Sequence, residues 1–174
     1  MAIRSAEPGG AAAPTYVFLS YAFTPDGRMV FQKHLPPEAK RNELDLTGDE
    51  DRLHGTIFTH NHPLGWDYAA DDPRRAGSSF SPDDILLASK TNLHELRAVS
   101  PMYRFSLRPS GEGWPSADAI ARAYDLVELR WQQRFLASIR DGTMNIFQAD
   151  AEHFHETWEE VAQLLGLIYI RERR

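Results

Sequence analysis

Residues Gly55 to Leu87, GTIFTHNHPLGWDYAADDPRRAGSSFSPDDILL, decide the fold, because they combine a strand, a loop and a helix start around side chains typical of metal chemistry. Segment 55–59 is rich in apolar, β-branched and aromatic residues, which predicts a short buried strand. His60 and His62 come at its end. Side chains at positions i and i+2 of an extended chain project from the same face. Both imidazoles can therefore reach one ion, at about 2 Å from each ring nitrogen.

The second half of this stretch carries the signals of a helix start. Pro63 ends the strand, and after a polar loop Ser81 is placed as N-cap, Pro82 as the first helical residue and two acids in the first turn. We therefore expect a helix over 82–90.

Two histidines and one carboxylate, at a strand end and a helix start, predict a three-ligand zinc site whose fourth position is open to water. Such open sites are catalytic rather than structural.

The order His60-Asn61-His62-Pro63, a spacer, and Ser81-Pro82-Asp83-Asp84 resembles the motif of the JAMM metalloproteases, also called the MPN-plus or JAB family. The residues within and around the two motifs are most similar to those of RadC-like proteins and of the JAB domains attached to phage head proteins and bacterial polymorphic toxins. The resemblance implies that zinc is held by His60, His62 and Asp84, and that Ser81 lies beside the reacting carbonyl. It is strong over about a fifth of the chain.

The spacer of this motif is longer than is usual in the family, as though WDYAADDPRRAG were inserted after Gly65. A surface loop tolerates such an insertion at small entropic cost. Trp66 and Tyr68 lie in this loop, and we hypothesise that they contact the substrate. A plain exposed loop is the alternative.

The general base is the weaker part of the resemblance. JAMM enzymes place a glutamate well before the first histidine, where it accepts a proton from the zinc-bound water. Here no glutamate lies between Pro8 and Pro37. Glu7 has a plausible separation from His60, although its surroundings are rich in glycine, alanine and proline, and it is our candidate for the base.

The amino-acid composition limits the number of domains, the binding partners and the metal ligands that this chain can have. A chain of 174 residues with 42% hydrophobic content fits one soluble domain. A net charge of −6 argues against broad binding to nucleic acid or anionic membranes. The absence of cysteine excludes disulfides and thiolate ligands. No apolar run has the length of a membrane span, so we expect a cytoplasmic protein, with delivery as part of a larger effector or phage system as the alternative.

The rest of the chain predicts one mixed α/β domain over 15–174, after a flexible tail at 1–14. We expect a hairpin of strands at 15–23 and 28–34, a short helix at 37–46, an acidic solvated loop at 48–51, and strands at 95–100 and 103–107. Two C-terminal helices within 116–165 follow, one from 116 to about 139 and one over 151–165, and a last strand covers 167–171. The first helix has an apolar stripe that we assign to the core: Leu126, Leu129, Phe135, Leu136 and Ile139. His153 and His155 point apart on the second helix, so we do not expect them to chelate one ion.

Taken with the resemblance, the domain is expected to be a curved JAMM/MPN-like sheet flanked by helices, with the zinc site at one edge. The implied activity is zinc-dependent hydrolysis of peptide or isopeptide bonds, with a protein or peptide substrate such as a ubiquitin-like conjugate. One alternative is a catalytically inactive binding or assembly module, and another is an effector or toxin domain. The sequence leaves the oligomeric state open.

Overall fold

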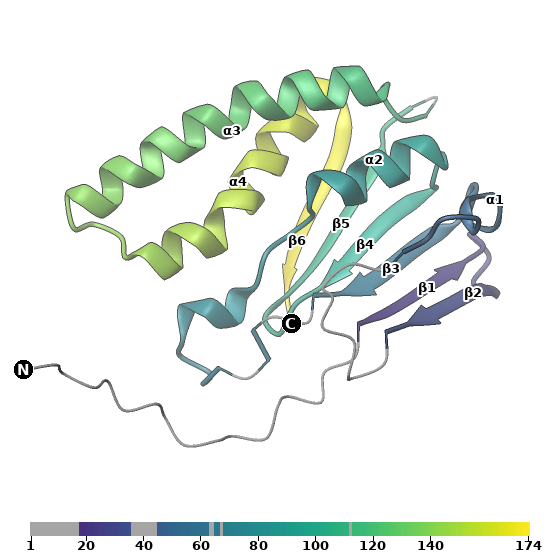
Figure 1. Cartoon of the computed structure of the whole chain (residues 1–174), viewed down its shortest axis with the longest axis horizontal. Coiled ribbons are helices and arrows are strands. Elements are labelled where there is room, and N and C mark those ends of the chain that lie inside the picture. The colour runs from purple at the N-terminus through teal and green to yellow at the C-terminus, as the bar shows by residue number, and fades with distance from the viewer. Residues whose placement is uncertain (1–17, 36–44, 63–64, 67, 112) are drawn as a thin grey trace, which may run out of the picture.

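The computed structural model describes residues 18–35, 45–62, 65–66, 68–111 and 113–174. Figure 1 shows a six-stranded sheet with three longer helices against it. The strands are β1 (Leu19–Phe23), β2 (Met29–His34), β3 (Ile57–Asn61), β4 (Glu95–Val99), β5 (Tyr103–Pro109) and β6 (Leu167–Arg173). The helices are α1 (Glu50–Leu53), the 3₁₀ turn η1 (Pro73–Ala76), α2 (Pro82–Lys90), α3 (Ala117–Arg140) and α4 (Ile146–Leu165). The predicted mixed α/β single domain is confirmed.

The sheet has the order β2-β1-β3-β4-β5-β6. Four of its neighbouring pairs are antiparallel, and β3 with β4 is parallel. A parallel pair needs a crossover connection, which the loop after β3, η1 and α2 provide. The predicted hairpin is formed by β1 and β2, and Gly27 allows its turn because its φ of 94° is unfavourable for other residues.

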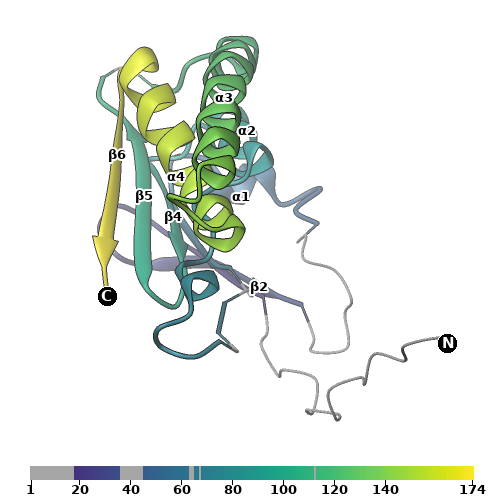
Figure 2. The ribbon, with the colours of Figure 1, turned by 90° about the vertical axis from the view of Figure 1, so that its left-hand side faces the viewer.

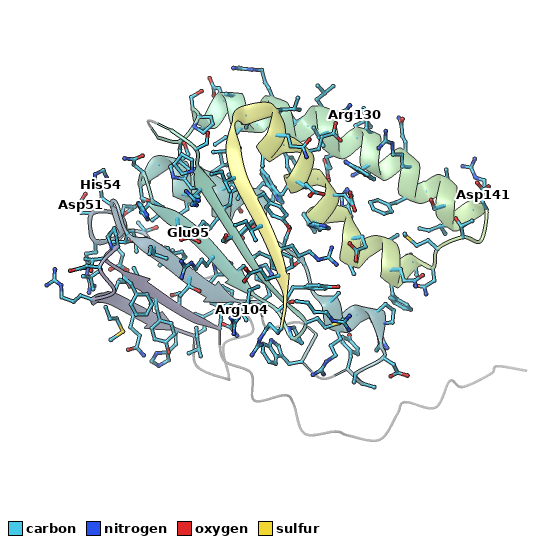
Figure 3. All side chains as sticks on the ribbon, turned by 180° about the vertical axis from the view of Figure 1, so that it is seen from behind. Asp51, His54, Glu95, Arg104, Arg130 and Asp141 are labelled. Atoms are coloured by element: carbon cyan, nitrogen blue, oxygen red, sulfur yellow. The ribbon has the colours of Figure 1, made fainter. Side chains whose placement is uncertain are left out.

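The helices cover one face of the sheet, with α4 between the sheet and α3 (Figure 2). Burial alternates along β1 and β3, as expected for strands with one covered face. The buried positions include Ser20, Ala22, Phe58 and His60. The largest fully buried side chain is Trp158 of α4, and Phe80, just before α2, is also fully buried. Figure 3 looks onto the opposite face, where Glu95 and Arg104 lie on β4 and β5.

Four expectations from the sequence were wrong. The acidic segment 48–51 is not all loop, because Glu50 and Asp51 begin α1, whose Leu53 is fully buried. Helix α4 begins at Ile146, five residues before the predicted 151. The group His60, His62 and Asp84, expected at one edge of the sheet, lies at the end of β3, which is an interior strand in the sheet order. The apolar stripe assigned to the core is only partly buried, since the exposed fractions of three leucines are 61% for Leu126, 55% for Leu129 and 60% for Leu136.

Two further predictions, the tail at 1–14 and nearly all of the helix at 37–46, fall outside the described residues. In the described part of the chain, no helix has both the length and the apolar character needed to cross a membrane.

Candidate metal centre

The two histidines reach the site because of the alternation along β3. His60 occupies a position that faces the helix-covered side of the sheet, and only 3% of it is exposed. His62 follows two residues later and therefore projects from the same face. Its backbone N–H still donates to the carbonyl of Val99, at 2.9 Å, so the parallel pairing with β4 holds His62 in place beyond the end of β3.

Asp84 reaches the site because of how α2 begins. Ser81 is the N-cap, as predicted, and its Oγ accepts from the backbone N–H of Asp84. In return Asp84 Oδ2 accepts from the backbone N–H and the hydroxyl of Ser81, at 2.7 and 2.8 Å. This capping box occupies one carboxylate oxygen. The other oxygen, Oδ1, is left to face His60.

Three potential ligand atoms meet at this point. Nε2 of His60 lies 3.1 Å from Nε2 of His62 and 3.4 Å from Oδ1 of Asp84. Ligands about 2.0 to 2.1 Å from a tetrahedral ion are about 3.3 to 3.4 Å from one another. Two edges of this triangle are thus close to the edges of a zinc coordination tetrahedron, and the potential ligand atoms of the three residues all lie within 4.8 Å of one another. The predicted grouping of His60, His62 and Asp84 is present in the structure.

The surroundings orient the ligands toward such an ion. His62 Nδ1 lies 3.0 Å from Ser78 Oγ, and if Nδ1 carries the proton, this contact leaves the Nε2 lone pair directed at the site. Nδ1 of His60 is buried and has no hydrogen-bond partner among the described residues. A buried, incompletely paired imidazole is costly, and a cation bound at Nε2 would offset part of that cost. The ligand set fits zinc, because imidazole and carboxylate are among its usual ligands.

The charge balance of the site also favours a cation. Burial and the neighbouring His60 lower the pKa of His62 to about 4, although Asp84 opposes this shift. Burial alone would raise the pKa of Asp84, but the two histidines and the Ser81 N–H hold it well below its usual range. At neutral pH His62 is therefore neutral and Asp84 is ionised. These are the protonation states that metal binding requires.

Of the two predicted substrate contacts, Trp66 lies beside the candidate ligands and Tyr68 packs inside the inserted loop. The Trp66 indole N–H donates to the backbone carbonyl of His62, at 2.9 Å, so Trp66 lies directly beside the site. Tyr68 packs within the loop, where the Arg74 guanidinium lies 4.0 Å from its ring centroid. The same guanidinium lies 4.8 Å from the Phe147 ring centroid, which connects the loop to α4. Glu7, the candidate base, is outside the described residues.

Two residues of the site were missed by sequence reasoning. Ser78 contacts His62, and its only sequence signal is a small hydroxyl side chain in the loop before α2. Trp158 donates its indole N–H to the carbonyl of Phe80, at 2.8 Å, and so anchors the segment that carries Ser78 and Ser81. No local pattern connects residue 158 with residue 80, so this contact could not have been found from the sequence.

A second group of possible ligands lies on α4 and is a poorer site. Glu152, His155 and Glu156 have potential ligand atoms within 4.8 Å of one another. However, Arg171 makes two hydrogen bonds with Glu152, and Nδ1 of His155 pairs with the Tyr169 hydroxyl. A guanidinium at this position already neutralises Glu152 and repels a cation. His155 belongs to this group and His153 does not.

Comparison with known proteins adds no family assignment. No protein-family model matches the chain, and neither the curated proteins nor the solved structures compared with it give a match.

Proposed function

We propose that this protein is a zinc-dependent hydrolase of amide bonds, with a JAMM/MPN-like site formed by His60, His62 and Asp84. The observation that carries the proposal is the position of His60 Nε2, 3.1 Å from His62 Nε2 and 3.4 Å from Asp84 Oδ1, because both distances are close to the edge of a zinc tetrahedron. The half-buried His62 and Asp84 leave one side of the site open, which is the arrangement of catalytic rather than structural zinc sites.

When bound, zinc would lower the pKa of a water molecule toward neutrality and polarise the carbonyl of the substrate. In this proposal Asp84 and the histidines hold the ion. The Ser81 hydroxyl, which donates to Asp84 Oδ2 in this structure, turns to the substrate carbonyl beside it and stabilises the developing oxyanion. Trp66 forms one wall of the approach to the site. Glu7 is the candidate that accepts the proton. The substrate class is a peptide or isopeptide bond, with ubiquitin-like conjugates as the first to test.

The first experiment measures zinc in the purified protein by elemental analysis. We expect about one zinc per chain in the wild type, and loss of that zinc in His62→Ala and in Asp84→Asn. The asparagine keeps the size of the side chain and an oxygen for the capping box. The matched control is His54→Ala, because His54 is exposed at the end of α1 (Figure 3) and should leave the zinc content unchanged. Unchanged zinc in both site variants would refute the assignment.

The second experiment tests catalysis on the zinc-loaded protein. We expect cleavage of a fluorogenic peptide or isopeptide substrate that is abolished by a chelator, and a loss of kcat in Glu7→Gln without loss of zinc. Activity that survives in Glu7→Gln would exclude Glu7 as the base.

A second candidate function is a metal-binding module without catalysis. It is favoured by the composition of the site, because the three-residue group contains Asp84 as its one carboxylate among the described residues. Stoichiometric zinc without cleavage of any amide substrate would support this candidate over the hydrolase.

A further inference from the structure

Helix α3 has two apolar faces, and among the described residues only one of them packs against the rest of the domain. The inner face buries Ile120, Tyr124, Val127 and Phe135. The other face carries Leu126, Leu129 and Leu136, each more than half exposed. Three leucines on one side of a solvent-facing helix are unusual for a surface that only contacts water.

The position of α3 leaves this second face without a covering element in the part of the chain that the structure describes. Figure 2 shows α3 as the outermost helix, with α4 between it and the sheet. Arg130 of α3 pairs with Glu160 of α4, and the Trp131 indole N–H also donates to Glu160, so these contacts close the seam between the two helices. Leu126 lies one turn before Arg130, and Leu164 lies one turn after Glu160. Because α3 and α4 are antiparallel, both leucines lie in the same direction from the pair, and Leu164 is 57% exposed.

We call Leu126, Leu129, Leu136 and Leu164 the outer patch. The charges of α3 vary along this patch. Residues 117–128 contain three acidic residues and one arginine, whereas residues 129–140 contain three arginines and no acidic residue. At 100° per residue, Asp118, Leu129 and Arg140 fall within about 40° of one another on the helix surface. Asp118 and Arg140 are each eleven residues from Leu129.

The charge distribution of α3 is complementary to that of a second α3 helix when the two helices run antiparallel. Two α3 helices that pack antiparallel about Leu129 bring Asp118 of each copy opposite Arg140 of the other, and the leucines lie between these two pairs. A parallel arrangement would place acidic residues against acidic residues and arginines against arginines. Isologous contacts of this kind are the usual basis of two-fold dimers. We therefore propose that the outer patch binds a second copy of the chain, through antiparallel packing of α3 on α3.

The test is the molar mass of the full chain in solution, measured by sedimentation equilibrium or by light scattering after gel filtration. We expect a dimer for the wild type at about 100 μM and a monomer for Leu129→Arg, in which two guanidinium groups meet at the centre of the interface. The control is Met29→Arg, because Met29 is 52% exposed but lies on β2, away from α3. It should remain a dimer. A monomeric wild type, or a dimer that persists in Leu129→Arg, would overturn the proposal.

A mixing experiment tests the orientation. Asp118→Arg alone places arginine opposite arginine, and Arg140→Asp alone places aspartate opposite aspartate, so the dissociation constant of each should rise by about tenfold or more. An equimolar mixture restores both pairs in a heterodimer, which should form with an affinity near that of the wild type. If the two variants do not associate on mixing, the antiparallel arrangement is wrong, and a different partner protein becomes the occupant to look for.

Discussion

At the scale of single residues, the candidate metal centre includes a side chain that contacts a candidate ligand without being one itself. Ser78 contacts Nδ1 of His62 at 3.0 Å. Removing such an outer contact typically lowers metal affinity by about 10-fold to 100-fold. We expect this loss for Ser78→Ala, measured by competition with a chelator of known zinc affinity, because the imidazole would no longer be held in one orientation.

The matched control is Ser106→Ala, which makes the same change on β5, outside the site. It should leave the zinc affinity within about twofold of the wild type. Equal affinities for all three proteins would show that the contact between Ser78 and His62 has no part in orienting the ligand.

The positions of the three candidate ligands were predictable, because each follows from a local rule. The two-residue period of a strand places His60 and His62 on one face, and the capping signal at Ser81 places Asp84 in the first turn of α2. Ser78 follows no such rule. The direction of its side chain depends on the path of a loop that is fixed from α4, by the bond between Trp158 and Phe80.

At the scale of secondary-structure elements, α4 supports the candidate metal centre, although none of the three candidate ligands lies on this helix. Trp158→Phe removes the indole N–H and leaves the buried Phe80 carbonyl without this donor. We expect a loss of about 1 to 3 kcal/mol in the free energy of unfolding, and a lower zinc affinity as well, because the segment before α2 loses its anchor. Chemical denaturation and zinc titration measure the two effects separately.

Trp114→Phe is a matched control for this prediction. Its indole N–H donates to the carbonyl of Leu93, at 2.7 Å, beyond the C-terminal end of α2, whereas the site lies at the N-terminal end of this helix. It should destabilise the fold but leave the zinc affinity of the folded protein unchanged. If both variants bind zinc as the wild type does, α4 does not position the site.

The elements also show where local sequence rules fail. Both ends of α2 were predicted correctly. The start has a clear signal, because Ser81 caps the helix and Pro82 is its first residue. Helix α4 was predicted too short, although Asn145 and Gln148 form a capping box that the sequence contains. Helix α3 carries two apolar stripes. Which of them is buried depends on where α4 packs. That information is tertiary, so the stripe with Leu126, Leu129 and Leu136 was assigned wrongly to the core.

At the scale of the whole molecule, one ion pair connects the last strand to the last long helix. Arg171 of β6 makes two hydrogen bonds with Glu152 of α4. Burial alone would raise the pKa of the Glu152 carboxyl, but Arg171 holds it below its usual value. A carboxyl with a lowered pKa in the folded state stabilises the fold above its unfolded pKa, which is about 4.3 for glutamate. This stabilisation is lost as the pH falls through the lower, folded value.

We therefore expect Glu152→Gln to lower the free energy of unfolding at pH 7 by about 1 kcal/mol, since the pair is only partly buried. The difference from the wild type should shrink well below pH 4, where both proteins lack the charge. Urea denaturation at several pH values measures this difference. Glu172→Gln on the exposed side of β6 is the control, and a pH-independent difference for Glu152→Gln would contradict the expected role of the charge.

The order of the strands was the least predictable part of the fold. The β1 and β2 hairpin follows from a turn between two short strands, and the same holds for β4 and β5. The placement of β1 beside β3, and of β6 beside β5, joins segments that are far apart in the chain. Such pairings depend on the fit of whole faces rather than on any local signal.

The charged residues of strand β6 also help the molecule to avoid aggregation. It is the last strand in the sheet order, so one of its sides has no strand partner within the sheet. Its second half, Arg171-Glu172-Arg173, alternates charges of opposite sign and includes two arginines. Charged side chains along an edge discourage another chain from adding its own strand, and so suppress open-ended fibrils. Association by a helical surface closes on itself after two copies, whereas association by this edge could continue without limit.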